Sequence, residues 1–190
     1  LKEFFQVIWR NKMARVGFII LVFFLLLAIF GPMFVPAPES NYLARLKAPS
    51  AAHILGTDYA GRDILALFIN GSRSVLLVAF YAALFSIIFA CGIGITAGLV
   101  GGKVDEILML ITNIVLTMPT LPVTMVLSMV INVSNDILFG LVLSLWSWAG
   151  LAKAIRSQVL VIRNKDFIEA SRVMGISTIN IIIKDVVPNI

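Results

Sequence analysis

The chain has 190 residues, of which 60% are hydrophobic and 13% are charged, and its mean hydropathy is +1.02. A soluble domain carries about twice that charged fraction, so composition excludes a soluble protein. The net charge of +5 does not indicate nucleic-acid binding, because many of the basic residues gather at the two ends of the chain. By the positive-inside rule, this distribution predicts that both ends lie in the cytoplasm.

The chain begins with a predicted amphipathic segment and a first membrane span. Residues 1–15 are expected to form a cytoplasmic helix in the membrane interface, with an aromatic apolar face. That face consists of Phe4, Phe5, Ile8 and Trp9. Residues 16–35 contain no charged side chain and are long enough to cross the hydrocarbon core. Their length and the position of Pro38 argue against a cleaved signal, so we expect a retained anchor.

Residues 36–73 are predicted to form an extracytoplasmic segment. Its distinctive residues are His53, Gly56, Thr57, Asp58, Gly61, Arg62, Asp63, Gly71 and Arg73. Gly56 and Gly61 flank a predicted turn, in which Thr57 or Asp58 is suited to cap a following helix. Asp58, Arg62 and Asp63 can form a local cluster of ion pairs. Because the spacing of the histidine and the aspartates matches no metal-ligand pattern, capping is favoured over a metal site.

The second span is predicted at residues 75–100. Small residues recur every fourth position here, at Ala90, Gly94, Gly98 and Gly102. Such a stripe allows another helix to approach closely. The single cysteine, Cys91, lies in the same span and excludes an intrachain disulfide framework.

The third span, predicted at residues 107–133, carries polar side chains at helical spacing. They are Asn113, Thr117, Thr120, Thr124 and Ser128, which a continuous helix would place on one face. Pro119 and Pro122 should kink this helix. The polar face has two interpretations, a wall of a translocation path or hydrogen bonding between packed helices. No charged side chain is expected deep in any span, which disfavours an ion-coupled pump.

A fourth span, residues 137–152, is followed by a charged helix–turn–helix unit in residues 153–190. Asp166 is predicted to cap its first helix with Glu169 as the capping-box partner, and Phe167, Ala170 and Met174 share one face. Gly175 suits the left-handed residue that ends this helix. Ser177 is predicted to cap the second helix, which Pro188 ends. The alternative is an amphipathic hairpin that rests on the bilayer. Four spans predict an all-α membrane bundle.

At these residues the chain resembles the permease subunits of binding-protein-dependent ABC importers. Their motif is Glu-Ala-Ala, three residues, Gly, nine residues, a hydrophobic residue, one more residue, and Leu-Pro. Glu169, Ala170, Gly175 and Pro188 stand at matching positions. The departures are Ser171 for the second Ala, Asp185 at the hydrophobic position, and Val187 for Leu.

Other stretches resemble the second permease subunit of the dipeptide, oligopeptide and nickel group. They are Trp9-Arg-Asn-Lys12 with Val16-Gly17, His53-x-Leu-Gly-Thr-Asp58 with Gly61-Arg-Asp63 and Gly71-x-Arg73, Val104-Asp-Glu-Ile-Leu-Met109, and Met118-Pro119. Leu110 and Asn113 stand where that group usually has Arg and Asp, so a charge pair is missing. The family continues with two further spans, and the sequence is therefore expected to be a fragment.

The resemblance implies a type I importer permease in the cytoplasmic (inner) membrane of a prokaryote, with residues 74–190 forming the permease core. It implies four kinds of partner: a homologous second permease subunit, two ATPase subunits, an extracytoplasmic solute-binding protein and the lipid membrane. The implied ATPase-coupling residues are Asp166, Phe167, Glu169, Ala170, Ser171, Arg172, Met174, Gly175 and Pro188.

The chain itself is expected to bind no cofactor, with ATP and Mg held by the partner subunits. Gly102-Lys103 does not extend to a phosphate-binding loop, so ATP hydrolysis is not expected on this chain. A membrane hydrolase is disfavoured, because His53 is the only histidine and lies outside the spans. A non-transporting scaffold or passive channel remains the alternative function.

Overall fold

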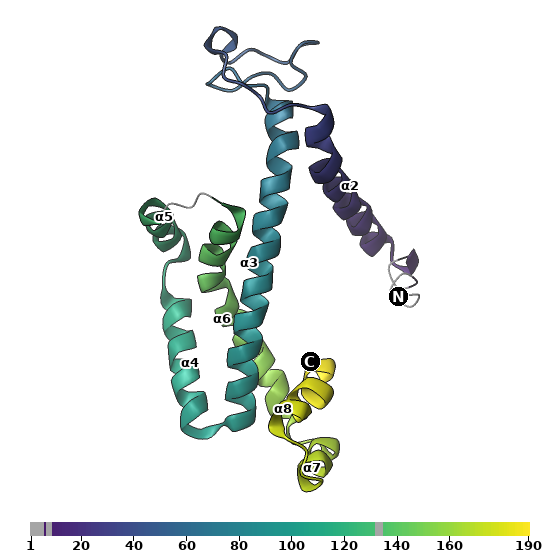
Figure 1. Ribbon diagram of the computed structural model, residues 1–190, viewed down its shortest axis with the longest axis vertical. Helices are drawn as coiled ribbons and strands as arrows, with labels where there is room; N and C mark the ends of the chain where they lie inside the picture. Colours follow the sequence, from purple (N-terminus) through teal and green to yellow (C-terminus); the bar gives the residue numbers. More distant parts are fainter. Residues whose placement is uncertain (1–5, 7–8, 132–134) are drawn as a thin grey trace. The chain divides into compact units, whose positions relative to one another are not determined.

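The computed structural model describes residue 6, residues 9–131 and residues 135–190, and most of these residues are helical (Figure 1). Within them, three helices are long and apolar enough to cross a membrane: α2 (Lys12–Phe34), α3 (Ile64–Val100) and α6 (Asp136–Ile162). A bent pair of helices could supply a fourth crossing. The predicted all-α membrane fold is confirmed. Of the amphipathic helix predicted at residues 1–15, residues 1–5, 7 and 8 lie outside the described residues, and residues 12–15 belong to α2.

The chain divides into two compact units, residues 1–77 and residues 78–190, with α3 running through the boundary. In the first unit, the Asn11 side chain begins α2 by accepting a hydrogen bond of 3.0 Å from the Met13 amide. The end of α2 lies close to α3: a Cβ on Gly31 would stand 2.5 Å from a side-chain carbon of Ile69. Asn70 Nδ2 also donates to the carbonyl of Val35 at 3.1 Å. The two helices are thereby held together beside the interhelical segment, residues 35–63.

In the second unit, the predicted third span is two helices, α4 (Gly102–Thr117) and α5 (Thr120–Val130), at an angle of 87°. The kink predicted from the prolines is therefore confirmed, and it falls at Met118 and Pro119. Met118 is extended, with φ −72° and ψ 136°, because a residue before proline is kept out of the helical region. Pro122 lies in the first turn of α5, where its missing N–H breaks no helical hydrogen bond.

The chain ends in a C-terminal hairpin, residues 166–189. Its first arm is α7 (Asp166–Val173), and its second arm is a short α-helix (α8, Thr178–Ile181), a π-helical turn (η2, Ile182–Val186) and a 3-10 turn (η3, Val187–Asn189). Buried side chains of both arms join the core between α3 and α6. This shared core consists of Ala90, Ile95, Trp148, Ala149, Ala152, Ile155, Val159, Ile162, Ile168, Ile181 and Val186.

Candidate coupling site

The turn of the C-terminal hairpin is fixed by Gly175. Its φ is +73°, the left-handed conformation that the sequence predicted. The Gly175 amide donates to the Arg172 carbonyl at 2.9 Å, and the Ile176 amide donates to the Ser171 carbonyl at 3.1 Å. These two hydrogen bonds make a Schellman motif, which satisfies the last carbonyls of α7 and reverses the chain.

The starts of the two arms differ from the predicted caps. Asp166 is the first residue of α7 and not its cap, and the N-cap residue Lys165 makes no side-chain capping bond. A carboxylate in the first turn still favours the helix through its dipole. Ser177 occupies the predicted N-cap position of α8, but its side chain makes no capping bond either. Hydrophobic packing and the Schellman turn therefore define the hairpin more than its caps do.

The two faces of α7 have different environments. Ile168 is fully buried and Ser171 is 7% exposed, because this face packs against Ile181 and Val186 of the second arm. On the rest of the helix surface, Phe167 is 45% exposed, Met174 68% and Val173 83%. The face predicted from Phe167, Ala170 and Met174 is thus uncovered in the single chain. An uncovered apolar face on a well-packed helix is suited to contact another molecule.

Ser171 and Asp185 connect the two arms. The Ser171 hydroxyl donates to Asp185 Oδ2 at 3.0 Å, and the Asp185 carbonyl accepts from Asn189 Nδ2 at 2.7 Å. Ser171 and Asp185 stand at two of the three positions at which the chain departs from the permease motif given above. The hydrogen bond explains how a carboxylate is accommodated at a hydrophobic position, because its partner is a hydroxyl at a position usually occupied by Ala.

Two arginines connect the end of α6 to the helices beside it. Both Nε and an Nη of Arg156 donate to the carboxylate of Asp105 at the start of α4. Such bidentate pairs fix geometry as well as charge. Arg163 donates to the Gly98 carbonyl at 2.8 Å, near the end of α3. Since α6 runs almost directly into α7, these contacts link the C-terminal hairpin to α3 and α4.

The stripe of small residues in α3 lies directly against α6. Ala90 is fully buried, a Cβ on Gly94 would stand 2.6 Å from the Ala152 carbonyl, and one on Gly98 would stand 2.6 Å from Val159 Cγ1. Gly102, by contrast, lies beyond the end of α3, has φ +55°, and has open space where a Cβ would be. The stripe therefore ends at Gly98, and Gly102 is the first residue of α4.

The five polar residues of the predicted third span are divided by the bend. Asn113 and Thr117 lie on α4, and Thr120, Thr124 and Ser128 lie on α5, so they do not form one helical face. The hydroxyls of Thr117, Thr124 and Ser128 each donate to a carbonyl of their own helix. The buried polar residue of α4 is its neighbour Thr112, which the sequence pattern did not single out. A role of the five residues in a translocation path stays a prediction.

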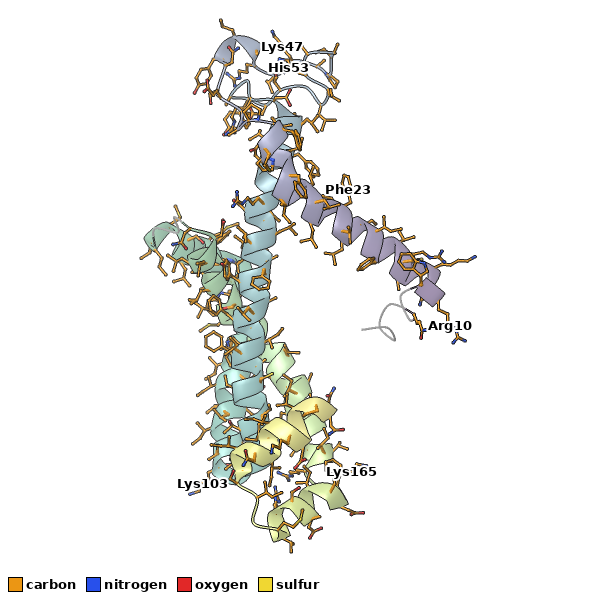
Figure 2. The ribbon with its side chains drawn as sticks, turned by 45° about the vertical axis from the view of Figure 1, so that its right-hand side comes forward. Arg10, Phe23, Lys47, His53, Lys103 and Lys165 are labelled. Carbon is orange, nitrogen blue, oxygen red and sulfur yellow. The ribbon has the colours of Figure 1, made fainter. Side chains whose placement is uncertain are left out.

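The interhelical segment, in which Figure 2 labels Lys47 and His53, contains most of the predicted signature residues. Asp58 accepts hydrogen bonds from the amides of Ala60 and Arg62 and pairs with the Arg62 guanidinium at 2.7 Å. Thr57 pairs with Lys47, whose amide donates to Thr57 Oγ1 at 2.8 Å. Gly56 and Gly61 have φ of +76° and +73°. The turn predicted between these glycines is present, but Asp58 caps the turn itself and no helix.

Asp63 makes the contacts that hold the segment to α3. Its Oδ1 accepts from the Ala66 amide at 3.0 Å, so Asp63 is the residue that caps α3. Its Oδ2 lies 2.9 Å from His53 Nδ1, whereas the sequence had grouped Asp63 with Asp58 and Arg62.

The Ala66 amide and His53 hold the pKa of Asp63 below its usual value. Burial raises the pKa of Asp58, but hydrogen bonds from Arg62 and Ala60 outweigh it, and that pKa is also lowered. Gly71 and Arg73 lie exposed on α3, outside this network.

Several residues of the site had no individual sequence signal. Asp105, Arg156 and Arg163 are charged residues near the ends of predicted spans, but only the structure pairs them. Asn70, which connects α2 to α3, is a single polar residue in an apolar run. Among the described residues, no group of three or more His, Cys, Asp or Glu side chains is arranged to hold a metal ion.

Residues 90–190, which include α4 to α6 and the C-terminal hairpin, match the family of binding-protein-dependent transport system inner membrane components. The chain belongs to this family, the permeases of type I ABC importers. Residues 1–49 match the N-terminal transmembrane domain of oligopeptide transport permease C.

Individual relatives are similar along nearly the whole chain. The oligopeptide transport system permease protein OppC of Bacillus subtilis (strain 168) is 35% identical over 181 residues, covering 94% of this chain and 59% of that protein. The dipeptide transport system permease protein DppC of the same organism is 33% identical, covering 95% and 57%. OppC of Escherichia coli (strain K12) is 32% identical, covering 95% and 61%. The chain thus spans about three-fifths of the length of these relatives.

Proposed function

We propose that this chain is part of the transmembrane subunit of an ATP-driven importer of peptides, and that the C-terminal hairpin couples it to separate ATPase subunits. In this proposal ATP and Mg are bound by the ATPase subunits, and this chain hydrolyses nothing. Closure of the ATPases moves the hairpin, and the spans change between inward-facing and outward-facing arrangements.

The single observation that carries the proposal is the division of α7 into a packed face and an uncovered face. Ile168 joins the core that contains Trp148 and Val159, so a displacement of α7 is passed to α6. Phe167, Val173 and Met174 are exposed on the rest of the helix surface. A helix that is fixed to the spans on one face and free on the other is suited to transmit force from a partner.

The cargo is proposed from the relatives. Those most similar in sequence are named as oligopeptide and dipeptide transport permeases, which favours peptides. Nickel or a related small solute fits the wider group, but none of these names supports it. The proposed partners are a homologous second permease subunit, two ATPase subunits and an external solute-binding protein. The basic ends of the chain favour an orientation with the N-terminus and the hairpin in the cytoplasm.

The proposal is tested by purifying the full-length protein from its native membrane. A coupling permease retains its ATPase subunits, releases them when the exposed face of α7 is changed (Val173→Asp with Met174→Asp), and supports ATP-dependent peptide uptake in proteoliposomes. A scaffold retains no ATPase. A passive channel passes peptide without ATP. Either of these last two results would refute the proposal. The matched control is the double change Ser157→Asp with Gln158→Asp at exposed positions of α6, which should retain the ATPase subunits.

A further inference from the structure

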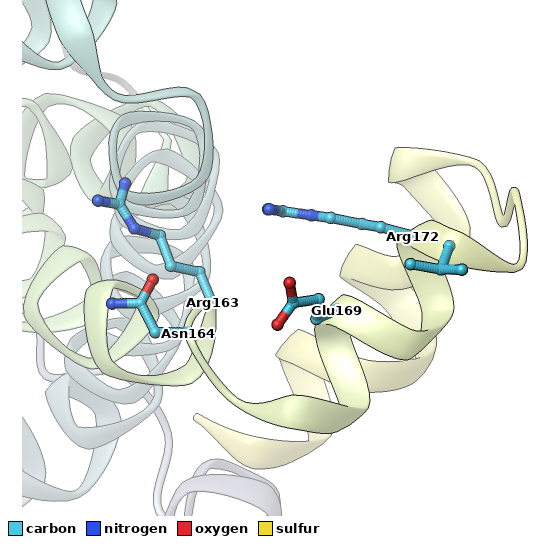
Figure 3. Close-up of a pocket in the computed structure, with 5 residues that line it drawn as sticks. Arg163, Asn164, Glu169 and Arg172 are labelled. Atoms are coloured by element: carbon cyan, nitrogen blue, oxygen red, sulfur yellow. The ribbon is translucent and has the colours of Figure 1, made fainter.

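A charged hollow of about 510 Å³ lies between the end of α6 and α7. It is lined by Arg163, Asn164, Glu169, Arg172 and Val173. Figure 3 shows the Arg172 side chain reaching from α7 toward Arg163, with the Glu169 carboxylate on the same side of the helix. The hollow therefore contains two guanidinium groups and one carboxylate, a net charge of +1.

Among the residues that the structure describes, no ion pair neutralises the arginines of this hollow. The described residues form ion pairs at Asp63, Asp58 and Asp105, and neither Arg172 nor Glu169 takes part in any of them. Arg163 uses one N–H on the Gly98 carbonyl, and a guanidinium has five such donors. Both arginines thus keep free donors that border the same space.

We propose that this hollow is the socket for an acidic side chain, Asp or Glu, on the surface of the ATPase subunit. This inference rests on the proposed function and names the chemistry of the contact. The planar fork of a guanidinium binds a carboxylate through two parallel hydrogen bonds. Arg163 follows the last residue of α6 and Arg172 lies on α7. A carboxylate bound by both would therefore contact each side of the connection between these two helices.

The surroundings of the hollow favour a protein over a lipid surface. Val173 lines the hollow and is 83% exposed, and Met174 beside it is 68% exposed, so an apolar contact surface continues directly from the charged one. Glu169 lies in the same hollow, and an anionic bilayer would bring negative charge against it. A protein surface can place a carboxylate at the arginines and a neutral or basic group at Glu169.

The test measures the affinity of labelled ATPase subunit for the full-length permease, paired with its second permease subunit, in nanodiscs of neutral lipid. Arg172→Glu should weaken binding by about tenfold or more, and the loss should shrink at high salt. Arg172→Lys keeps the charge but not the planar fork of the guanidinium, so its affinity for the ATPase should lie between those of the unaltered permease and Arg172→Glu. An acid-to-arginine scan of the ATPase surface should find one position that restores binding to Arg172→Glu. Lys103→Glu, the same charge reversal at an exposed position on α4, is the control and should bind normally.

Different results separate this inference from the proposed function. If unaltered permease binds no ATPase, the proposed function fails. If it binds, but Arg172→Glu binds equally well or no acidic ATPase position restores it, the socket is refuted while the coupling role stands. If Arg172→Glu weakens binding only in nanodiscs containing phosphatidylglycerol, the occupant is a lipid headgroup, which also refutes the socket. Circular dichroism of each variant checks that the helices are intact.

Discussion

Ser171 and Asp185 form a hydrogen bond of 3.0 Å between positions fourteen residues apart, one on each arm of the C-terminal hairpin. Both residues depart from the permease motif that the chain otherwise matches in spacing. The two departures are therefore not independent, because each supplies the partner that the other needs.

This dependence is testable with a double-mutant cycle. Ser171→Ala should destabilise the protein by about 1–2 kcal/mol, because it leaves a half-buried carboxylate without its donor. Asp185→Val alone should leave the Ser171 hydroxyl unpaired, and the double variant, which restores an apolar pair, should be more stable than the sum of the single effects predicts. Thermal unfolding of the purified protein in detergent measures each corner of the cycle. Ser157→Ala on the exposed surface of α6 is the control, and simple additivity would contradict the interaction.

Gly175 is expected to tolerate no larger residue without cost. Its φ of +73° is strained for any L side chain, although a Cβ there would meet nothing within 4 Å. Gly175→Trp should therefore cost about 1–3 kcal/mol through backbone strain alone. Gly175→Asn should cost less, since Asn adopts this conformation more readily. We expect the Trp variant to insert normally and to show uncoupled or absent peptide uptake. Normal uptake by this variant would contradict the role of the turn, and Gly150→Ala, on open helical surface, is the control.

The close approach of α3 to α6 predicts a steric effect at Gly98. A Cβ there would stand 2.6 Å from Val159 Cγ1, so Gly98→Ala should destabilise the protein by about 1–3 kcal/mol through overpacking. Adding Val159→Ala should recover part of that loss by making room. Gly92→Ala on the same helix meets nothing within 4 Å and should be neutral or stabilising. The midpoint of thermal unfolding measures the stability of all three variants. Equal effects of Gly92→Ala and Gly98→Ala would show that the packing of α3 against α6 does not cause the destabilisation.

The carboxylates of Asp58 and Asp63 predict how the interhelical segment responds to pH. The pKa of each is lowered from an ordinary value of 3.8, so each binds protons less readily in the folded chain than in the unfolded one. The stability they add is fully present above about pH 4 and is lost as the pH falls through the folded pKa values. Amide hydrogen exchange in residues 44–63, corrected for intrinsic rates, should therefore accelerate in acid. Asp63→Asn should reduce this dependence, and Glu39→Gln, at an exposed carboxylate, should not.

The sequence predicted those features that depend on one residue or on a local period. The apolar runs predicted the spanning helices, the left-handed turn follows from Gly175, and the break in the third span follows from Pro119 and the residue before it. The helix lengths were less predictable, since α6 continues past the charged Lys153 to Ile162. Charge limits the part of a helix that can lie in lipid, but it does not end the helix.

The features that the sequence did not predict depend on which residues meet across helices. Gly102 continued the four-residue period, yet α3 ends at Val100 and the period has no meaning beyond that point. Asp63 could be grouped with any nearby charge, and its pairing with His53 required the path of the loop. Arg156 and Asp105 are 51 residues apart along the chain, and no local pattern relates them.

The continuous core from Ala90 and Trp148 to Ile168 and Val186 also has a consequence for folding. Detaching the C-terminal hairpin would expose side chains that pack against α3 and α6. Local unfolding of the hairpin alone is therefore expected to require a large free energy. It should melt together with the bundle as one cooperative unit and should resist proteolysis as long as the bundle is intact.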